Sequence, residues 1–284
     1  MQDLTTQAAN KQFLRSIADN NNQIPDGLDN FAFARALLAN LGSPDGELRD
    51  DLSYMILASG IIDQEKLTPE QMGELLTTVL DSNHLFYHIG ETNTDSVFMR
   101  SFSNLIVAAI LYTDAKAPEL SEHVVQQTRE TLLRYAREER DWRGYVEGKG
   151  WAHAMAHLAD ALDECAQNQS MTTRDRQDVM LAIRDLAQLP VPLYHEEDMR
   201  LATVAHHIIL VKQVDEAFLS EWLESCYVRR DSDILAWMSA TNVKNFLRSL
   251  YFLLLWDNMS PLIVDQISNI LKRQDDVYIQ TSSR

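Results

Sequence analysis

Apolar residues recur with a period of about 3.6 along nearly the whole 284-residue chain, and no segment sustains an alternation of two. Glycine and proline number only nine and seven, which is typical of a helical protein rather than one with many tight β-turns. The pattern predicts an all-α protein. The predicted helices cover 6–19, 28–41, 48–60, 68–81, 95–113, 120–137, 151–167, 174–188, 198–212, 216–228, 231–239, 241–256 and 260–272.

The ends of several predicted helices carry residues suited to them. Thr68, Ser121 and Ser260 stand where a hydroxyl caps a helix N-terminus, and Thr68 and Ser260 are each followed by proline. Gly60 falls where a helix is expected to stop.

The predicted helices group in pairs. The second helices begin near residues 48, 95, 151, 198 and 241. A spacing of about 45 residues matches two-helix HEAT or armadillo-like repeats. We therefore expect a right-handed α-solenoid, a single elongated domain over 1–284, with an N-terminal cap and first helices at 1–47, central repeats at 48–212 and C-terminal repeats and cap at 213–284. A closed helical bundle fits the same pattern and is the alternative.

The composition excludes several classes of partner. A formal charge of −17 disfavours nucleic acid, because phosphate binding needs a basic face. The longest apolar run, Ser249–Trp256, is too short to span a bilayer, and the N-terminal stretch lacks a secretory signal pattern. Cys165 and Cys226 have no CxxC partner, which favours reduced, buried thiols that are not nucleophiles. We expect a cytoplasmic protein with neither a membrane nor a nucleic-acid partner.

The stretch GYVEGKGWAHAMAH, Gly144 to His157, concentrates glycine and histidine. Its G-x-x-x-G-K spacing is one residue shorter than a phosphate loop, and Gly150 stands where Ser or Thr would bind magnesium. A nucleotide-binding loop is therefore disfavoured. Anion binding at the N-terminus of the following helix stays open.

The predicted helix that begins at Trp151 has two distinct faces. The core face carries Trp151, Met155, Leu158, Leu162 and Cys165, and the opposite face carries His153, His157, Asp160 and Glu164 between alanine flanks. No Lys or Arg occurs from 151 to 173, although a face in bulk water usually carries them. The polar face is therefore predicted to form the floor of a groove.

The preceding helix, 95–113, has a predicted core stripe that ends with Leu105, Ala109 and Tyr112. Arg100 lies on its other face and is expected to point towards His153 and Asp160, either as a salt bridge to Asp160 or as a ligand contact. The expected N-terminal cap of this helix is Asp95 or Thr94. The predicted core stripe also contains Phe98 and Phe102, and the opposite face also contains Ser96, Ser103 and Asn104.

Two further stretches bear on the site. The charged run 138–143 adjoins the glycine-rich stretch, which places Asp141, Arg143 and Tyr145 at the rim of the same groove. One repeat further on, His206 and His207 cannot share a face, so one of them is expected to pack in the core.

Three stretches stand out together, in this order: LFYHIGETNTDSVFMRSFSNL (85–105), the run that joins Arg143–Val146 to Gly148–His153, and Ala156–Asp160. With these stretches the chain resembles an uncharacterised bacterial family, the domain of unknown function 2785. The resemblance covers about residues 48 to 210 and weakens towards the C-terminus. It is compatible with a helical-repeat fold and implies no activity, substrate or cofactor.

These observations leave three hypotheses open. The first is a helical-repeat protein that binds a peptide, a protein or a small polar ligand in a groove. The second is a metal-dependent hydrolase in which His153, His157 and Asp160 hold a divalent metal and Glu147, Asp160 or Glu164 acts as a ligand or general base. The third is a structural interaction scaffold, and a homo-oligomer is compatible with all three. No cofactor is expected under the first hypothesis, whose groove residues are Arg100, Asp141, Arg143, Tyr145, Lys149, Trp151, His153, His157 and Asp160.

Overall fold

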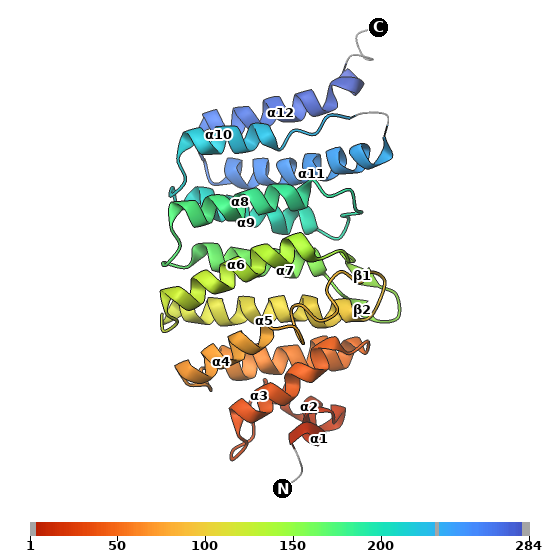
Figure 1. Ribbon diagram of the computed structural model, residues 1–284, viewed down its shortest axis with the longest axis vertical. Coiled ribbons are helices and arrows are strands. Elements are labelled where there is room, and N and C mark those ends of the chain that lie inside the picture. The colour runs from red at the N-terminus through yellow and green to blue at the C-terminus, as the bar shows by residue number, and fades with distance from the viewer. Residues whose placement is uncertain (1–3, 231–232, 280–284) are drawn as a thin grey trace. The chain divides into compact units, whose positions relative to one another are not determined.

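Helices account for most of the protein in the computed structural model, which describes residues 4–230 and 233–279, with side chains up to 275 (Figure 1). The all-α prediction is therefore confirmed. The chain divides into two compact units, Met1–Ser170 and Met171–Arg284. The boundary lies inside the predicted central repeats at 48–212.

The first unit contains helices of three kinds and one short hairpin. The α-helices are α1 (Leu4–Ala8), α2 (Lys11–Ala18), α3 (Asn30–Leu38), α4 (Pro69–Val79), α5 (Ser96–Lys116), α6 (Glu122–Glu138) and α7 (Ala154–Gln167). A 3₁₀ turn, η1 (Ala39–Gly42), follows α3, and two π-helical segments follow it, η2 (Glu47–Tyr54) and η3 (Ile56–Ile62). Strands β1 (Tyr145–Val146) and β2 (Gly150–Trp151) pair antiparallel.

Several helix boundaries in this unit depart from the predicted ones. The predicted helix 6–19 is broken at Asn10, whose side chain accepts hydrogen bonds from the backbone N–H groups of Gln12 and Phe13 and so caps α2. The prediction that a helix stops at Gly60 is wrong, because Gly60 lies within η3. A Cβ atom there would collide with the backbone carbonyl of Asn22, so glycine permits the close approach of another segment.

Two of the predicted N-terminal caps are confirmed. Thr68 accepts a hydrogen bond from the Gln71 N–H, and the Gln71 side chain accepts one from the Thr68 N–H, which completes a capping box. Ser121 caps α6 through the Val124 N–H.

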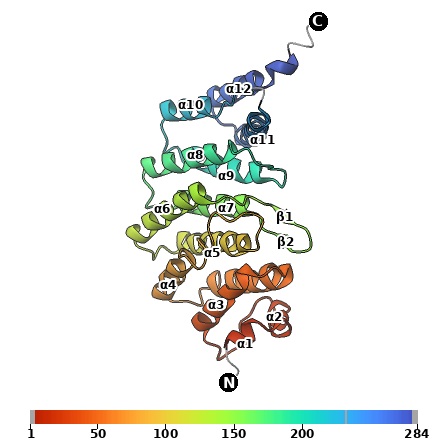
Figure 2. The same ribbon diagram turned by 45° about the vertical axis from the view of Figure 1, so that its right-hand side comes forward.

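Helix α5 forms the centre of the first unit and packs against α7, α4, η1 and η3. It is long and apolar enough to cross a membrane by length and composition, but 72% of that apolar stretch is buried inside the structure. A mostly buried helix of this kind is typical of the core of a soluble protein. Figures 1 and 2 show the hairpin β1–β2 at one end of α5 and α7, beside the loop that leads into α5.

In the described part of the second unit, the secondary-structure elements are all helices joined by loops. It contains α8 (Thr173–Ala187), α9 (Glu197–Leu210), α10 (Glu216–Ser225), α11 (Ile234–Trp256) and α12 (Pro261–Ile279), and α11 packs against α9 and α12. The predicted break between 231–239 and 241–256 is wrong, since Ala240 is fully buried within the continuous α11; residues 231–232 lie outside the described residues. The expectation that one histidine of the adjacent pair packs in the core is confirmed, because His206 is buried against Asp257, with Nε2 2.6 Å from Oδ2.

Candidate functional site

The stretch Gly144–Trp151 is a β-hairpin, not the loop and helix start that the sequence suggested. Tyr145 pairs with Trp151 and Val146 with Gly150. Gly148 and Gly150 have φ values of +74° and +81°, which glycine adopts without steric cost. Two strands of two residues each are too short to show an alternating pattern, so the hairpin left no periodic signal in the sequence.

A buried arginine of η2 holds this hairpin in place. The Arg49 guanidinium donates to the carbonyls of Lys149 and Trp151, at 2.8 and 3.0 Å, and to that of Ser43 at 2.6 Å. It also lies over the ring of Phe98, 4.0 Å from the centroid. Burial lowers the pKa of Arg49 because the charged form loses hydration, and within the described residues no carboxylate lies within ion-pairing distance. No motif or spacing in the sequence indicated this role of Arg49.

Lys149, predicted to edge the groove, pairs instead with the residue before α5. Its Nζ lies 2.6 and 2.9 Å from the two carboxylate oxygens of Asp95. Asp95 occupies the predicted cap position of α5, but its side chain makes no capping hydrogen bond. The lysine thus fastens the hairpin to the start of α5.

Aromatic rings run from the hairpin into the interior. The ring of Trp151 stacks on that of His153 at a centroid distance of 4.0 Å, and His153 lies 5.5 Å from His157. Tyr145 contacts Trp151 edge-on and is 50% exposed. The placement of Trp151 in the core is wrong, because the helix begins only at Ala154 and Trp151 belongs to an exposed strand (38%).

His157 is buried and its proton position follows from its neighbours. Ser101 Oγ lies 2.7 Å from His157 Nδ1 and also donates to the carbonyl of Ala152. A hydroxyl has a single proton, so Nδ1 of His157 must be the donor to Ser101. Phe102 contacts the imidazole edge-on at 5.1 Å. These contacts make His157 a link between α5, α7 and the hairpin end.

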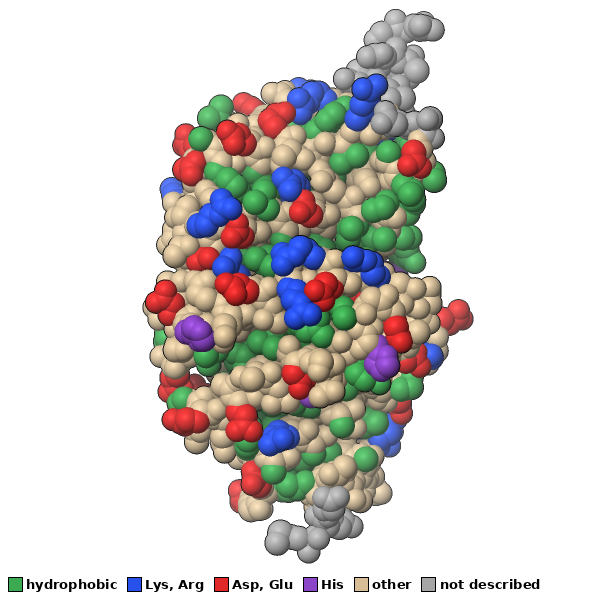
Figure 3. Space-filling view, in the orientation of Figure 1, with side chains coloured by type: hydrophobic (Ala, Val, Ile, Leu, Met, Phe, Trp, Pro, Cys, Tyr) green, Lys and Arg blue, Asp and Glu red, His purple; other side chains and the backbone are tan. Residues whose placement is uncertain are grey.

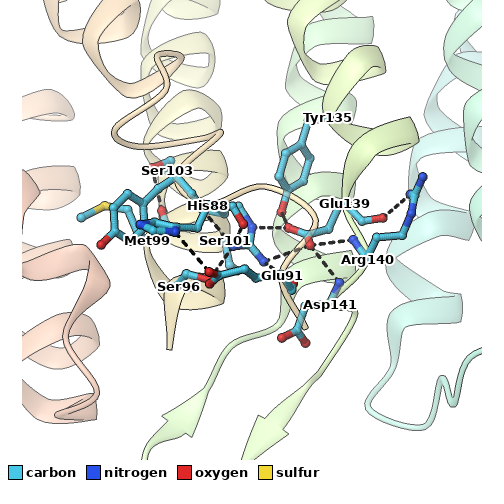
Figure 4. A network of polar contacts seen from close by, with 12 residues as sticks. His88, Glu91, Ser96, Met99, Ser101, Ser103, Tyr135, Glu139, Arg140 and Asp141 are labelled. Carbon is cyan, nitrogen blue, oxygen red and sulfur yellow. Dashed lines mark hydrogen bonds and ion pairs between the residues drawn. The ribbon is translucent and has the colours of Figure 1, made fainter. Parts of the chain in front are cut away.

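Arg100 does not point towards His153 and Asp160, so that prediction is wrong. Its guanidinium is fully buried and makes a bidentate ion pair with Glu139, with distances of 2.6 and 3.0 Å. Figure 4 shows Glu139 with its hydrogen-bonded neighbours Tyr135, Arg140 and Asp141. Burial acts to lower the pKa of Arg100, but the hydrogen bonds and charge of Glu139 together outweigh it, so the pKa is raised. Its remaining donors contact Ser96 and the carbonyls of Tyr87, His88 and Glu91.

The ion pair extends into a network that includes the predicted rim residues. Glu139 also accepts from the Tyr135 hydroxyl at 2.7 Å, and burial, followed by the charge of Glu139, raises the pKa of that phenol. Asp141 is buried and binds the guanidinium of Arg143, with Nε and Nη2 each at 2.7 Å. It also accepts from the backbone N–H of Asn93. Asp141 and Arg143 therefore tie the segment 139–143 to the loop before α5.

An open groove lies instead between η3, α5 and α7, with a volume of about 420 Å³. Asp160 and Glu164, from the predicted polar face of α7, line it together with Asp163. Its other lining residues are Tyr54, Ala58, Ser59, Asp63, Leu105, Ala108, Ala109, Tyr112, Thr113 and Lys116. Of the nine predicted groove residues, only Asp160 lines it.

The predicted faces of α5 are only partly confirmed: Phe98 and Phe102 are fully buried as expected, but the rest of the predicted core stripe is not. Tyr112, predicted to lie in the core, is 49% exposed in the groove, and Leu105 and Ala109 line the groove as well. Arg100, Ser103 and Asn104, predicted for the open face, are fully buried. The reason is that α5 is packed on several sides, so these polar residues lie inside while the groove receives apolar ones. Arg100 and Ser103 are hydrogen-bonded there, to Glu139 and to the carbonyl of Met99.

Neither metal nor thiol chemistry has a ready site in the described residues. No group of three or more His, Cys, Asp or Glu side chains in this part of the chain is placed to hold a metal ion. The metal hypothesis on His153, His157 and Asp160 stays a prediction. Cys165 and Cys226 are both buried, and burial raises the pKa of Cys226 to about 12, which disfavours the nucleophilic thiolate.

The described residues form an all-α protein whose first unit contains an acidic groove. A family model described as a protein of unknown function, DUF2785, matches residues 85–252 of the 284, so the chain belongs to this family. The match starts later and extends further towards the C-terminus than the resemblance suggested. It includes α5, α7 and the hairpin, whereas η3 lies outside it. Comparison with curated proteins gave no match, and comparison with solved structures gave none either.

Proposed function

We propose that this protein binds a small polar ligand or a peptide in the groove between η3, α5 and α7. The proposal is based on the volume of this groove and on the mixture of apolar and acidic residues that line it. A volume of about 420 Å³ is within the range of small-molecule sites, an apolar floor lies at Leu105 and Ala109, and carboxylates stand at its sides. Such a mixture supplies buried apolar area for affinity and a few polar groups for orientation.

The hairpin region supports this choice by contrast. The charged groups of Arg100 and Asp141 are buried and occupied by contacts within the chain. A ligand at these residues would have to break buried or bidentate contacts before it gained any of its own. The hairpin is thus better suited to holding the structure of the first unit than to binding.

We also propose that the helix pairs stack as HEAT-like repeats in a cytoplasmic protein. The second helices of successive pairs pack on each other within each unit, α5 on α7 in the first and α9 on α11 in the second. The first helices α8 and α10 also pack together. Stacking of this kind is how solenoids bury their apolar stripes, and the buried location of α5 agrees with a soluble chain.

The test of binding is a thermal-unfolding screen of small polar molecules and short peptides against the full chain. A ligand that binds only the native state raises the melting temperature by mass action. The matched variant is Ala109→Trp, which fills the groove with an indole, and the matched control is Trp151→Ala in the hairpin. We expect stabilisation of the wild type and of Trp151→Ala, and its loss in Ala109→Trp when that variant melts cooperatively.

Two outcomes would overturn the proposal. One is stabilisation that survives in Ala109→Trp and disappears in Trp151→Ala, which would move the site to the hairpin. The other is stoichiometric metal in the untagged protein, by elemental analysis, that His153→Ala with His157→Ala removes; this would support the hydrolase hypothesis instead.

A further inference from the structure

The groove is lined by more negatively than positively charged side chains. Four carboxylates line it, Asp63, Asp160, Asp163 and Glu164, and among the described lining residues Lys116 is the one cation. Elsewhere the charges are mixed: Figure 3 shows Lys and Arg side chains beside Asp and Glu over α6 and α8. A concave surface with excess negative charge attracts cations and repels anions. The ligand should therefore be positively charged.

Lys116 shows how the groove binds an ammonium group. Its Nζ lies 2.6 Å from Asp63 Oδ1 and 4.2 Å from the ring centroid of Tyr112. A carboxylate and an aromatic face together are a common recognition pair for an ammonium ion. The hydrogen bond to Asp63 raises the pKa of Lys116, so the amine stays protonated.

This internal contact is easy to exchange. The side chains of Lys116 and Asp63 are 45% and 52% exposed, and ion pairs with this exposure contribute little net stability. An ammonium group from a ligand could take the place of Lys116 on Asp63 and Tyr112, while the lysine moves into water. Lys116 thus acts as a built-in competitor.

The charges stand on both sides of an apolar floor. Asp63 follows η3, whereas Asp160, Asp163 and Glu164 belong to α7, and the floor between them is formed by Leu105, Ala108 and Ala109 of α5. A flexible aliphatic chain with charged groups at separate points fits this order. Its methylene groups would cover the floor and its ammonium groups would reach the two acidic sides.

Thr113 supplies a further observation that points to a ligand. Its hydroxyl is buried and has no hydrogen-bond partner in the described structure, although the residue lines the groove. A buried hydroxyl without a partner is unfavourable. Because the oxygen itself is covered, a ligand N–H donor would reach it after a neighbouring side chain moves, and would then satisfy it. Thr113 also lines a second, smaller pocket of about 170 Å³ that contains Glu65 and Glu119, so a longer chain could continue past it.

We propose that the groove binds aliphatic polyamines, flexible chains with two or more ammonium groups, and that Lys116 occupies one ammonium subsite until the ligand displaces it. This inference rests on the proposed function, because it names the chemistry of the same groove. A lysine-rich peptide offers the same ammonium groups but carries amide groups that the apolar floor would not satisfy.

The experiment is calorimetric titration of the full chain with spermidine, with an aliphatic diol of the same length as the neutral probe. We expect saturable binding of spermidine with one molecule per chain and none of the diol. Because the internal competitor is removed, Lys116→Gln should bind spermidine more tightly, by about threefold to tenfold. Lys272→Gln, which removes the same charge in the second unit, should leave the affinity unchanged.

A second pair of variants separates a built site from general attraction to an acidic protein. The triple change Asp160→Asn, Asp163→Asn and Glu164→Gln should weaken binding about tenfold or more, since the ligand loses its contacts with α7. The same number of charges removed from the second unit, by Glu216→Gln, Glu221→Gln and Asp265→Asn, should have little effect. Equal weakening by both triple changes would overturn the proposal.

The failure of this inference can be told from the failure of the proposed function. If spermidine does not bind but a neutral molecule or a lysine-rich peptide stabilises the wild type and not Ala109→Trp, the groove binds a ligand of another class and the polyamine inference is wrong. If nothing stabilises the wild type, both fail. Binding of spermidine that Lys116→Gln leaves unchanged or weakens would contradict the role of Lys116.

Discussion

The hairpin region and the groove of the first unit both place exposed aromatic rings beside charged side chains, but they differ in what those charges contact. Around the hairpin, Arg49, Arg100 and Asp141 are buried and bind carbonyls and ionised partners within the chain. In the groove, Lys116 and Asp63 form an exposed pair beside open space. An arginine or aspartate near aromatic rings therefore indicates a ligand site only after its internal partners are counted.

The largest expected loss of stability comes from breaking the buried ion pair between Arg100 and Glu139. Removing one partner leaves an uncompensated buried charge, so Arg100→Met should lower the free energy of unfolding by about 3–5 kcal/mol. The control is Arg134→Met, which breaks the exposed pair with Glu138 and should cost about 0–1 kcal/mol. Denaturant unfolding of both variants measures the difference, and a loss below that of the control for Arg100→Met would contradict the structural role.

Arg49→Met tests what holds the hairpin. The carbonyls of Lys149 and Trp151 would lose a charged donor, which should lower the free energy of unfolding by about 1.5–3 kcal/mol. Hydrogen exchange at the backbone amides of 145–152 should accelerate, because the hairpin would open locally. Unchanged exchange there would show that the Lys149–Asp95 pair alone is sufficient.

Substitutions in the groove should change ligand affinity and leave the stability nearly unaltered, unlike those of Arg100 and Arg49. Tyr112→Leu and Asp163→Asn alter side chains at an open surface, so the free energy of unfolding should stay within about 0.5 kcal/mol of the wild type. Spermidine affinity should nevertheless fall in both. A stability loss as large as that of Arg49→Met, without any change in affinity, would make the groove a structural region like the hairpin.

The smallest expected effect on stability is that of the exposed cluster of Glu47, Arg15 and Lys11, which lies outside both regions. Arg15 first, and then Lys11, lower the pKa of Glu47 from 4.5 to about 2. A carboxyl with a lowered folded-state pKa contributes stability above its unfolded value, and that contribution is lost as the pH falls from about 4.5 through about 2. The stability difference between wild type and Arg15→Gln should therefore shrink over this range at low salt. A difference that grows on acidification would contradict this sign.

The sequence predicted the helices well because their signal is local. Periodicity and caps such as Thr68 and Ser121 depend on neighbours within a few turns. The same pattern could not tell which sides of α5 are covered, because several elements pack around that helix: they bury Arg100 and leave Tyr112 exposed, against expectation.

The candidate site was predicted only in part for a related reason. Asp160 and Glu164 do line a groove, as the absence of Lys and Arg from 151 to 173 suggested. Arg100 was misplaced because its partner, Glu139, is 39 residues away and sits in a charge run that reads as solvated. Arg49 contacts a segment 100 residues away and carries no motif. Long-range pairing of this kind has no signature in one sequence.

The proposed function requires that the ligand binds in the groove and not at the hairpin. Hydroxyl-radical footprinting with and without spermidine tests it directly, because Tyr112 and Tyr145 have nearly equal exposure, 49% and 50%, in the two regions. The ratio of their oxidation in one sample cancels any scavenging by the amine. We expect spermidine to lower the oxidation of Tyr112 relative to that of Tyr145. Selective protection of Tyr145 and Trp151 would contradict it.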